Sequence, residues 1–295
     1  MKEPLVSVIV ITYNSSKYVL ETLESTKVQT YKNIELIISD DGSTDDTIEI
    51  CRNWLENNQQ RFKYSKLITV EKNTGIPANC NRGVKASNGE WVKIIAGDDI
   101  LKFKAISNYL RFVNNNENIQ VLQSEVSHFN DTFEDKNFIA SSDFKNHKFF
   151  YLPSKKQYRE LLIRNRLSAP AVIFKKEVYS QVYGFDEEFK YIEDHPFYLK
   201  ILSKGIKIWL TKDVNVGYRI HNKSVQKNSK PFVSAKFLDE AMLIFNKYRV
   251  KDLPVYYKIK IFLKIKLLIF LDKNGFNKRK WLNHKIYYIV NKLFQ

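Results

Sequence analysis

Long apolar runs that end in short polar stretches dominate the first hundred residues. Leu5–Ile11 and Ile34–Ser39 are nearly continuous apolar segments rich in β-branched residues, and Trp91–Gly97 is mostly apolar. Such runs are typical of strands that are buried on both faces, as in a parallel sheet. Polar stretches that can cap a helix precede Lys17–Gln29 and Thr47–Asn57. The order strand, helix, strand, helix therefore predicts a βαβα unit with a parallel sheet.

Polar side chains follow each of these three strands, in Thr12–Asn14, Asp40–Asp46 and the pair Asp98–Asp99. Ligands of open α/β sheets bind outside the carboxyl ends of the strands, so we expect one shared site there. Two adjacent carboxylates at a buried strand end are costly unless a cation or a hydrogen-bonded partner compensates them. Oxygen ligands suit Mg²⁺ or Mn²⁺, which predicts a metal that serves a phosphate-bearing ligand. Taken alone, the pair Asp98–Asp99 fits a helix cap or a turn equally well.

Two common phosphate-binding motifs are missing from the sequence. No G-x-G-x-x-G follows the first strand, and no G-x-x-x-x-G-K-[ST] occurs anywhere. Both a dinucleotide-binding fold and a P-loop enzyme are therefore disfavoured. Phosphate must be neutralised in another way, and a metal at Asp99 would do this.

Several segments together resemble the family 2 glycosyltransferases. The three strand-end motifs are Val6–Asn14, Asp40–Asp45 and Gly97–Asp99. The later ones are Asn73–Gly83, then Tyr183–Glu187 with Glu193–Asp194 (a "GFDE … ED" pattern), and Tyr218–Ser224 (an R-x-H-x-x-S pattern). The resemblance covers residues 4–226. It departs from the family at Cys80, where many members have arginine.

The resemblance implies a GT-A fold, an α/β, Rossmann-like arrangement with a mixed central sheet flanked by helices. It also implies a UDP-sugar donor. Asp41 would accept a hydrogen bond from the uracil N3–H, which suits a carboxylate. Tyr13 would lie against the base, beside Thr12 and Asn14. Asp98 would approach the ribose and the sugar.

The same resemblance implies a metal and a general base. Asp99 would bind the metal that bridges the two phosphates, and His221 would reach the same metal or the diphosphate. An imidazole ligand favours Mn²⁺ over Mg²⁺. Asp194, or Glu193 as second choice, would deprotonate the acceptor hydroxyl. Transfer would then invert the anomeric carbon in one displacement.

Composition is typical of a large globular unit in a reducing compartment. The chain has 295 residues, 44% of them hydrophobic, and only two cysteines, Cys51 and Cys80. This cysteine count does not favour a disulfide framework. Residues 1–4 lead directly into the first strand without a signal-peptide pattern, so we expect a cytoplasmic protein.

Positive charge is concentrated at the end of the chain. Of a formal net charge of +16, residues 251–295 contribute 11 basic minus 2 acidic residues, or +9. Aromatic and aliphatic residues interleave with these lysines, which favours contact with an anionic membrane surface, on the inner face of the plasma membrane. Alternatively, the segment packs on the catalytic domain or forms a homo-oligomer contact. Nucleic acid is a poor candidate partner, because the carboxylate-lined loops would repel phosphates and no known motif appears.

We therefore interpret residues 1–100 as the nucleotide-sugar-binding half and residues 101–226 as the acceptor-binding, catalytic half. Residues 227–295 form a basic helical extension. The expected activity is hexose transfer from a UDP-sugar to a glycan acceptor, a lipid-linked saccharide in cell-surface polysaccharide synthesis. Two alternatives stay open: a non-catalytic nucleotide-sugar-binding subunit, and a nucleotidyltransferase that consumes a nucleoside triphosphate.

Overall fold

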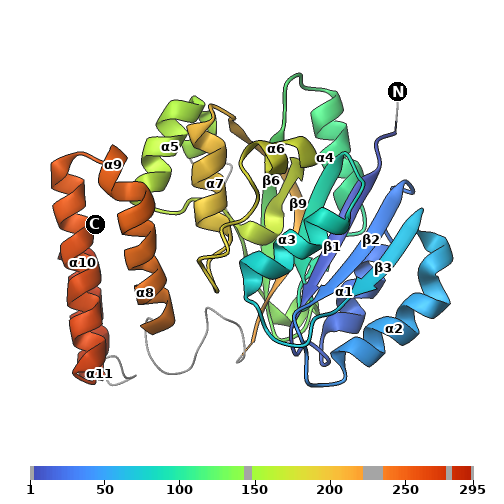
Figure 1. Cartoon of the computed structure of the whole chain (residues 1–295), viewed down its shortest axis with the longest axis horizontal. Helices are drawn as coiled ribbons and strands as arrows, with labels where there is room; N and C mark the ends of the chain where they lie inside the picture. Colours follow the sequence, from blue (N-terminus) through green and yellow to red (C-terminus); the bar gives the residue numbers. More distant parts are fainter. Residues whose placement is uncertain (1–2, 143–147, 222–234, 277–280, 294–295) are drawn as a thin grey trace.

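A mixed β-sheet forms the centre of the molecule (Figure 1). The computed structural model describes residues 3–142, 148–221, 235–276 and 281–293. Within them, nine strands form one sheet in the order β3-β2-β1-β4-β8-β6-β9-β5, with β7 paired to β6. The strands are β1 Val6–Thr12, β2 Ile34–Asp40, β3 Tyr64–Ile68, β4 Trp91–Ala96, β5 Ile100–Leu101, β6 Val121–Asn130, β7 Phe138–Ser141, β8 Val172–Lys175 and β9 Ile208–Ile220.

The first half of the sheet is parallel, as the sequence predicts. β1 lies between β2 and β4 and runs parallel to both, and β3 continues beside β2. β8 is antiparallel to its neighbours β4 and β6, whereas β6 and β9 are parallel. The expected mixed sheet is therefore present. The three apolar runs of the first hundred residues form β1, β2 and β4, each within one residue of its predicted limits.

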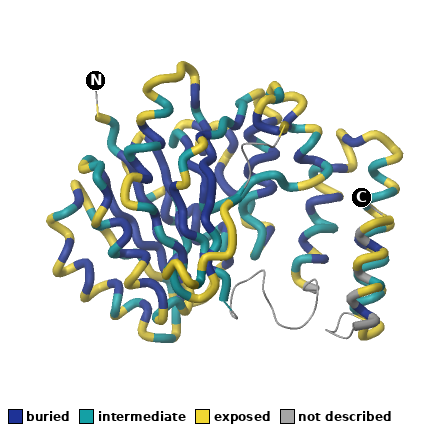
Figure 2. The backbone as a smooth tube through the Cα atoms, turned by 180° about the vertical axis from the view of Figure 1, so that it is seen from behind, coloured by how far each residue is buried: buried dark blue, intermediate teal, exposed yellow. Residues whose placement is uncertain are grey.

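Helices cover both faces of the sheet because successive side chains of a buried strand point to opposite faces. Val8 and Val10 of β1 pack in one core with α1 and α2, while Ile9 packs in a second core with α3 and α7. Figure 2 shows these central strands as buried along most of their length. The helices are α1 Val19–Lys27, α2 Thr47–Asn58, α3 Ile76–Ala86, α4 Ala105–Asn114, α5 Ser154–Ile163, α6 Lys176–Gln181, α7 Asp194–Ser203, α8 Ala235–Ile244, α9 Val250–Asp252, α10 Val255–Lys273 and α11 Trp281–Leu293.

One predicted helix has different limits in the structure. The first helix is shorter than Lys17–Gln29, because residues 13–18 form the turn that leads into α1.

β9 is the longest strand described and runs from Ile208 to Ile220. The polar residues Thr211–Asp213 do not end it, because the register between β6 and β9 shifts there and accommodates them.

After residue 234 the described chain consists of helices joined by short non-helical segments at 253–254 and 274–276, which confirms the predicted helical extension. Figure 1 shows α8 to α11 at one end of the molecule, away from β1 to β3. Lys247 anchors this extension by ion pairs to Asp186 (2.7 Å) and Glu188 (2.9 Å), and the Tyr248 hydroxyl donates to Asp186 (2.8 Å). No helix of the described part of the chain is long and apolar enough to cross a membrane. The Asn222–Ser224 part of the last motif lies outside the described residues.

Candidate active site

Backbone hydrogen bonds bring the three strand-end motifs together. The Asp41 N–H donates to the Thr12 carbonyl (3.0 Å), and the Gly97 N–H donates to the Ile11 carbonyl (2.9 Å). Gly97 permits this approach, since a Cβ atom there would lie 2.8 Å from Cγ2 of Thr12. The predicted meeting of these loops at one sheet edge is therefore observed.

Asp41 lies in a pocket of hydrogen-bond donors and is 2% exposed. Its carboxylate accepts from the Thr74 N–H (3.0 Å), the Thr74 hydroxyl (2.5 Å) and the Gly75 N–H (2.8 Å). Arg82 adds an ion pair at 2.8 Å. The expected donor-binding carboxylate is thus held by the amino-terminal end of α3. Cys80 is buried, and the cationic partner comes two positions later, from Arg82.

Thr12, the last residue of β1, and Asn14 shape the loop that follows, in which Tyr13 and Asn14 are exposed. The Thr12 hydroxyl donates to Asp40 (2.7 Å) and is buried. Asn14 has φ +50°, and its side-chain carbonyl accepts from the Thr44 N–H (2.8 Å), which ties the β1 loop to the β2 loop. Tyr13 is 48% exposed, which leaves its ring accessible.

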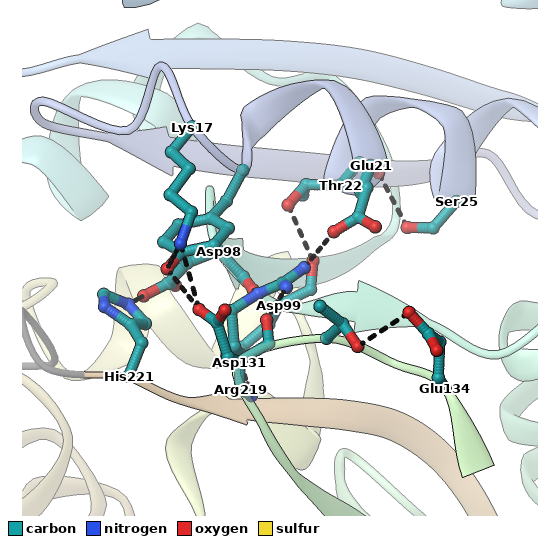
Figure 3. A network of polar contacts seen from close by, with 12 residues as sticks. Lys17, Glu21, Thr22, Ser25, Asp98, Asp99, Asp131, Glu134, Arg219 and His221 are labelled. Atoms are coloured by element: carbon teal, nitrogen blue, oxygen red, sulfur yellow. Dashed lines mark hydrogen bonds and ion pairs between the residues drawn. The ribbon is translucent and has the colours of Figure 1, made fainter. Parts of the chain in front are cut away.

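Arg219 fixes the Asp98–Asp99 turn (Figure 3). Its backbone N–H donates to Oδ1 of Asp99 (2.9 Å), and its Nε donates to the Asp98 carbonyl (2.7 Å). The guanidinium, 1% exposed, also donates to Glu21 and to the Asp131 carbonyl. Five fixed donors suit this task, which lysine could not perform. Arg219 is therefore a positioning residue for the aspartate pair.

His221 lies beside Asp98. Its Nε2 is 2.9 Å from Oδ2 of Asp98, and its ring packs 4.7 Å from the Tyr18 ring. Asp99 is 2% exposed. The structure thus joins His221 to the first aspartate of the pair, while one oxygen of the second is held by the Arg219 N–H.

A divalent cation fits this aspartate pair. Burial and then the neighbouring Asp98 charge raise the pKa of Asp99 well above its ordinary value. A bound cation would relieve both effects, because it stabilises the charged carboxylate. Among the described residues, no group of three His, Cys, Asp or Glu side chains could hold a metal. An ion held here by Asp98 and Asp99 would complete its shell with phosphate oxygens and water, as Mg²⁺ and Mn²⁺ do at phosphate sites.

The second carboxylate pair lies at the start of α7. Asp194 accepts from the His195 N–H at Oδ1 (2.6 Å) and from the Asn165 side-chain amide at Oδ2 (2.8 Å). Burial raises the pKa of Asp194. Burial and then the Asp194 charge raise the pKa of Glu193. Raised carboxylate pKa values at a cavity are typical of groups that move protons.

Glu240 of α8 holds the segment that leads into this pair. Its buried carboxylate accepts from three successive backbone N–H groups, those of Lys190 (2.6 Å), Tyr191 (3.0 Å) and Ile192 (2.8 Å). The Lys190 carbonyl in turn accepts from the Ile76 N–H (2.9 Å) at the start of α3. The helical extension therefore supports the loop before Glu193.

Asn81 joins α3 to the Tyr183–Glu187 motif. Its amide group donates to the Phe185 carbonyl (3.0 Å) and to Glu187 (2.7 Å), and its carbonyl accepts from the Phe185 N–H (2.9 Å). Two of the sequence motifs thus bind each other directly. This contact fixes the loop that leads from α6 toward the second carboxylate pair.

One cavity of about 600 Å³ brings both carboxylate pairs together. Its lining includes Asp98, Asp99, Glu193 and Asp194, along with Asn165. A second hollow of about 550 Å³ is lined by Thr74 and Arg82, the partners of Asp41. The cavity thus joins the predicted metal residue to the predicted base, while two partners of Asp41 line the second hollow.

Four contributing residues had no role assigned from the sequence: Arg82, Asn165, Arg219 and Glu240. Arg219 belongs to the Tyr218–Ser224 motif. Its place two residues before His221 is the sequence signal that could have identified it. Arg82 lies one helical turn after Asn79, on the face that carries polar side chains to the β2 loop. Asn165 and Glu240 act across 29 and about 50 residues, and no local pattern marks them.

Comparisons with known proteins point to one family. The family model for glycosyl transferase family 2 matches residues 7–182. The UDP-Glc:alpha-D-GlcNAc-diphosphoundecaprenol beta-1,3-glucosyltransferase WfaP of Escherichia coli is 32% identical over 228 residues, which are 76% of this chain and 80% of WfaP. An uncharacterized glycosyltransferase of Haemophilus influenzae is 28% identical and covers 95% of this chain and 100% of its own length.

Solved structures show the same fold at low identity. S. aureus TarS 1–349 in complex with UDP-GlcNAc has a TM-score of 0.64 at 22% identity, over 98% of this chain and 80% of that one. The mannosyltransferase PcManGT of Pyrobaculum calidifontis, in complex with GDP-Man and Mn²⁺, has a TM-score of 0.66 at 16% identity, over 99% and 81%. The predicted GT-A-like fold is therefore confirmed. By its sequence match and its fold, this chain belongs to glycosyl transferase family 2 and is a glycosyltransferase.

Proposed function

We propose that this glycosyltransferase moves a hexose from a UDP-sugar to a lipid-linked saccharide, with inversion and with the help of Mn²⁺. The observation that carries the proposal is the cavity in which Asp98 and Asp99 share a wall with Glu193 and Asp194. The first pair suits a metal beside the departing diphosphate. The second pair, whose pKa values are raised, suits removal of a proton from the acceptor hydroxyl. WfaP, a relative by sequence, has by its name a UDP-glucose donor and a diphosphoundecaprenol-linked acceptor.

The uracil ring of the UDP-sugar would lie between Tyr13 and Asp41. Tyr13 presents a half-exposed ring for stacking. Four donor groups contact the Asp41 carboxylate, one of them the Thr74 hydroxyl. A rotation of that hydroxyl would free one acceptor position on Oδ1, beside the Arg82 contact, for the uracil N3–H. Arg82 would remain paired with the carboxylate.

Asp98 and Asp99 would hold the metal, and Arg219 would keep their turn in place. When bound, the metal supplies positive charge to the departing diphosphate. His221 would stay near the diphosphate, oriented by its hydrogen bond to Asp98. As a ligand of the same ion instead, the His221 imidazole would favour Mn²⁺ over Mg²⁺.

The acceptor hydroxyl would lose its proton to Asp194 as its oxygen attacks the anomeric carbon. The bond from that carbon to the diphosphate oxygen breaks in the same step, so the configuration inverts. We assign the base to Asp194 because the Asn165 amide stabilises its charged form. Glu193, whose pKa the Asp194 charge raises, would be the neighbour that keeps a proton.

The test is a product assay with purified enzyme, UDP-sugars and a saccharide-diphosphate-lipid analogue. Release of UDP with formation of a β- or α-linked product of inverted configuration is expected with the wild type. Asp194→Asn should bind UDP and lose turnover by about 10³-fold, the scale of a lost general base. Release of pyrophosphate from a nucleoside triphosphate, or wild-type UDP binding without transfer to any acceptor, would contradict the proposal.

A further inference from the structure

One side of α10 exposes a stripe of large apolar side chains. The exposed fractions range from 39% to 67%, and the members are Val255, Tyr256, Ile259, Phe262, Leu263 and Phe270. At 100° per residue, these six positions fall within about one third of the helix circumference. We call them the outer face of α10. A run of such residues on a surface helix indicates an interaction site.

The opposite side of α10 already packs on the protein. Ile265 is 5% exposed, and Tyr257 and Ile261 lie against the core that α7 and α8 share. The helix is therefore held in place by its inner residues. On the outer face, the Phe262 ring lies 5.8 Å from the Phe245 ring, and the more exposed members are left for a partner in the part of the chain that the structure describes.

Positive charge accompanies the apolar stripe. Lys266 and Lys273 are exposed on the same face, and the Lys266 ammonium lies 5.5 Å from the Phe262 ring centroid. Lys260 lies 5.5 Å from the Tyr256 ring centroid. Residues 251–295 carry a net charge of +9. Lysines beside aromatic and aliphatic side chains are the composition of segments that lie in the interface of anionic bilayers.

We propose that the outer face of α10 docks on an anionic lipid bilayer. Charge decides between this partner and a second copy of the chain. A dimer through this face would bring two segments of +9 together, and like charges oppose such a contact. An anionic bilayer instead attracts the lysines while its acyl region accepts the apolar stripe. The extension would then hold the transferase at the surface on which a lipid-linked acceptor resides.

Vesicle co-sedimentation of the full chain tests this surface. The probes are phosphatidylcholine vesicles with and without about one third phosphatidylglycerol, at low salt and at about 0.5 M salt, which screens surface charge. Wild type should bind the anionic vesicles, and salt should weaken the binding. Ile259→Ser with Phe262→Ser should lower the partition coefficient by about tenfold or more, because apolar area no longer enters the interface. Lys266→Gln with Lys273→Gln should lower it by about fivefold per lysine.

The matched control is Tyr64→Ser with Phe103→Ser, two exposed aromatic residues on β3 and before α4. This control should bind as the wild type does, and thermal melting confirms that every variant is folded. Absence of wild-type binding to anionic vesicles overturns the proposal, as does equal binding by the Ile259→Ser, Phe262→Ser variant. A wild-type dimer that this variant dissociates, without vesicle binding, would assign the face to self-association instead. Vesicle binding needs no turnover, so its failure is separate from failure of the proposed transfer.

Discussion

Glu240 links the carboxyl-terminal extension to the proposed base, and its replacement makes a demanding prediction. Glu240→Gln keeps the length of the side chain and removes its charge. The carboxylate accepts from three successive backbone N–H groups, of Lys190, Tyr191 and Ile192, directly before Glu193. The glutamine amide could serve fewer of these donors, because its nitrogen is itself a donor.

The expected magnitude comes from these three hydrogen bonds. A hydrogen bond to a charged group contributes roughly 1 kcal/mol more than a neutral one, so three of them give about 3 kcal/mol. If the loss of this free energy opens the segment before Glu193, kcat should decrease by about 100-fold. The affinity for UDP should change much less, because Tyr13 and Asp41 lie on other loops.

The assay is steady-state kinetics together with UDP titration and thermal melting, on Glu240→Gln and on Asp239→Asn. Asp239 is the exposed neighbour on α8 and serves as the matched control for loss of one negative charge. We expect a large decrease in kcat for Glu240→Gln only, with UDP affinity preserved. A wild-type kcat in Glu240→Gln with a lowered melting temperature would refute the reasoning, since Glu240 would then stabilise the fold without positioning the base.

Two further predictions use the titration of buried groups. Asn165→Ala removes the amide that stabilises charged Asp194, so the pKa of Asp194 should rise further. The acid limb of the pH profile of kcat/KM should then move up by about 1 pH unit. If the limb does not move, another group is the base. Lys93 is fully buried, and burial lowers its pKa from 10.5 to about 7. Between these two pH values the unfolded chain binds a proton that the folded chain does not. The free energy of unfolding should therefore rise with pH across this range, by up to about 5 kcal/mol. Urea unfolding at several pH values should show this rise in the wild type and not in Lys93→Met, and a parallel rise in both would contradict the assignment.

The first half of the fold follows from local sequence pattern. β1, β2 and β4 are buried on both faces, so their apolar runs are long and mark the strands almost to the residue. Parallel pairing then places the loops at Thr12, Asp41 and Asp98 at one edge. Because this placement needs only strand direction, the meeting of these loops could be predicted before their contacts were known.

The second half depends on contacts that no local pattern specifies. β9 carries polar residues at 211–213, which resemble a turn in the sequence but are accommodated by an irregular register beside β6. Asn165 and Glu240 reach the base from distant segments and are ordinary polar residues in the sequence. Arg82 replaces the cation that family resemblance would place at position 80, and only the winding of α3 shows that it reaches Asp41.

The most direct test of the account is calorimetric titration with UDP, in Mn²⁺ and then in excess EDTA, on the wild type and on Asp99→Asn. Asparagine matches aspartate in shape and removes the charge that would hold the metal. The account predicts UDP binding by the wild type that depends on Mn²⁺ and is lost in Asp99→Asn. UDP binding that survives both EDTA and the substitution, or no UDP binding by the wild type in Mn²⁺, would contradict it.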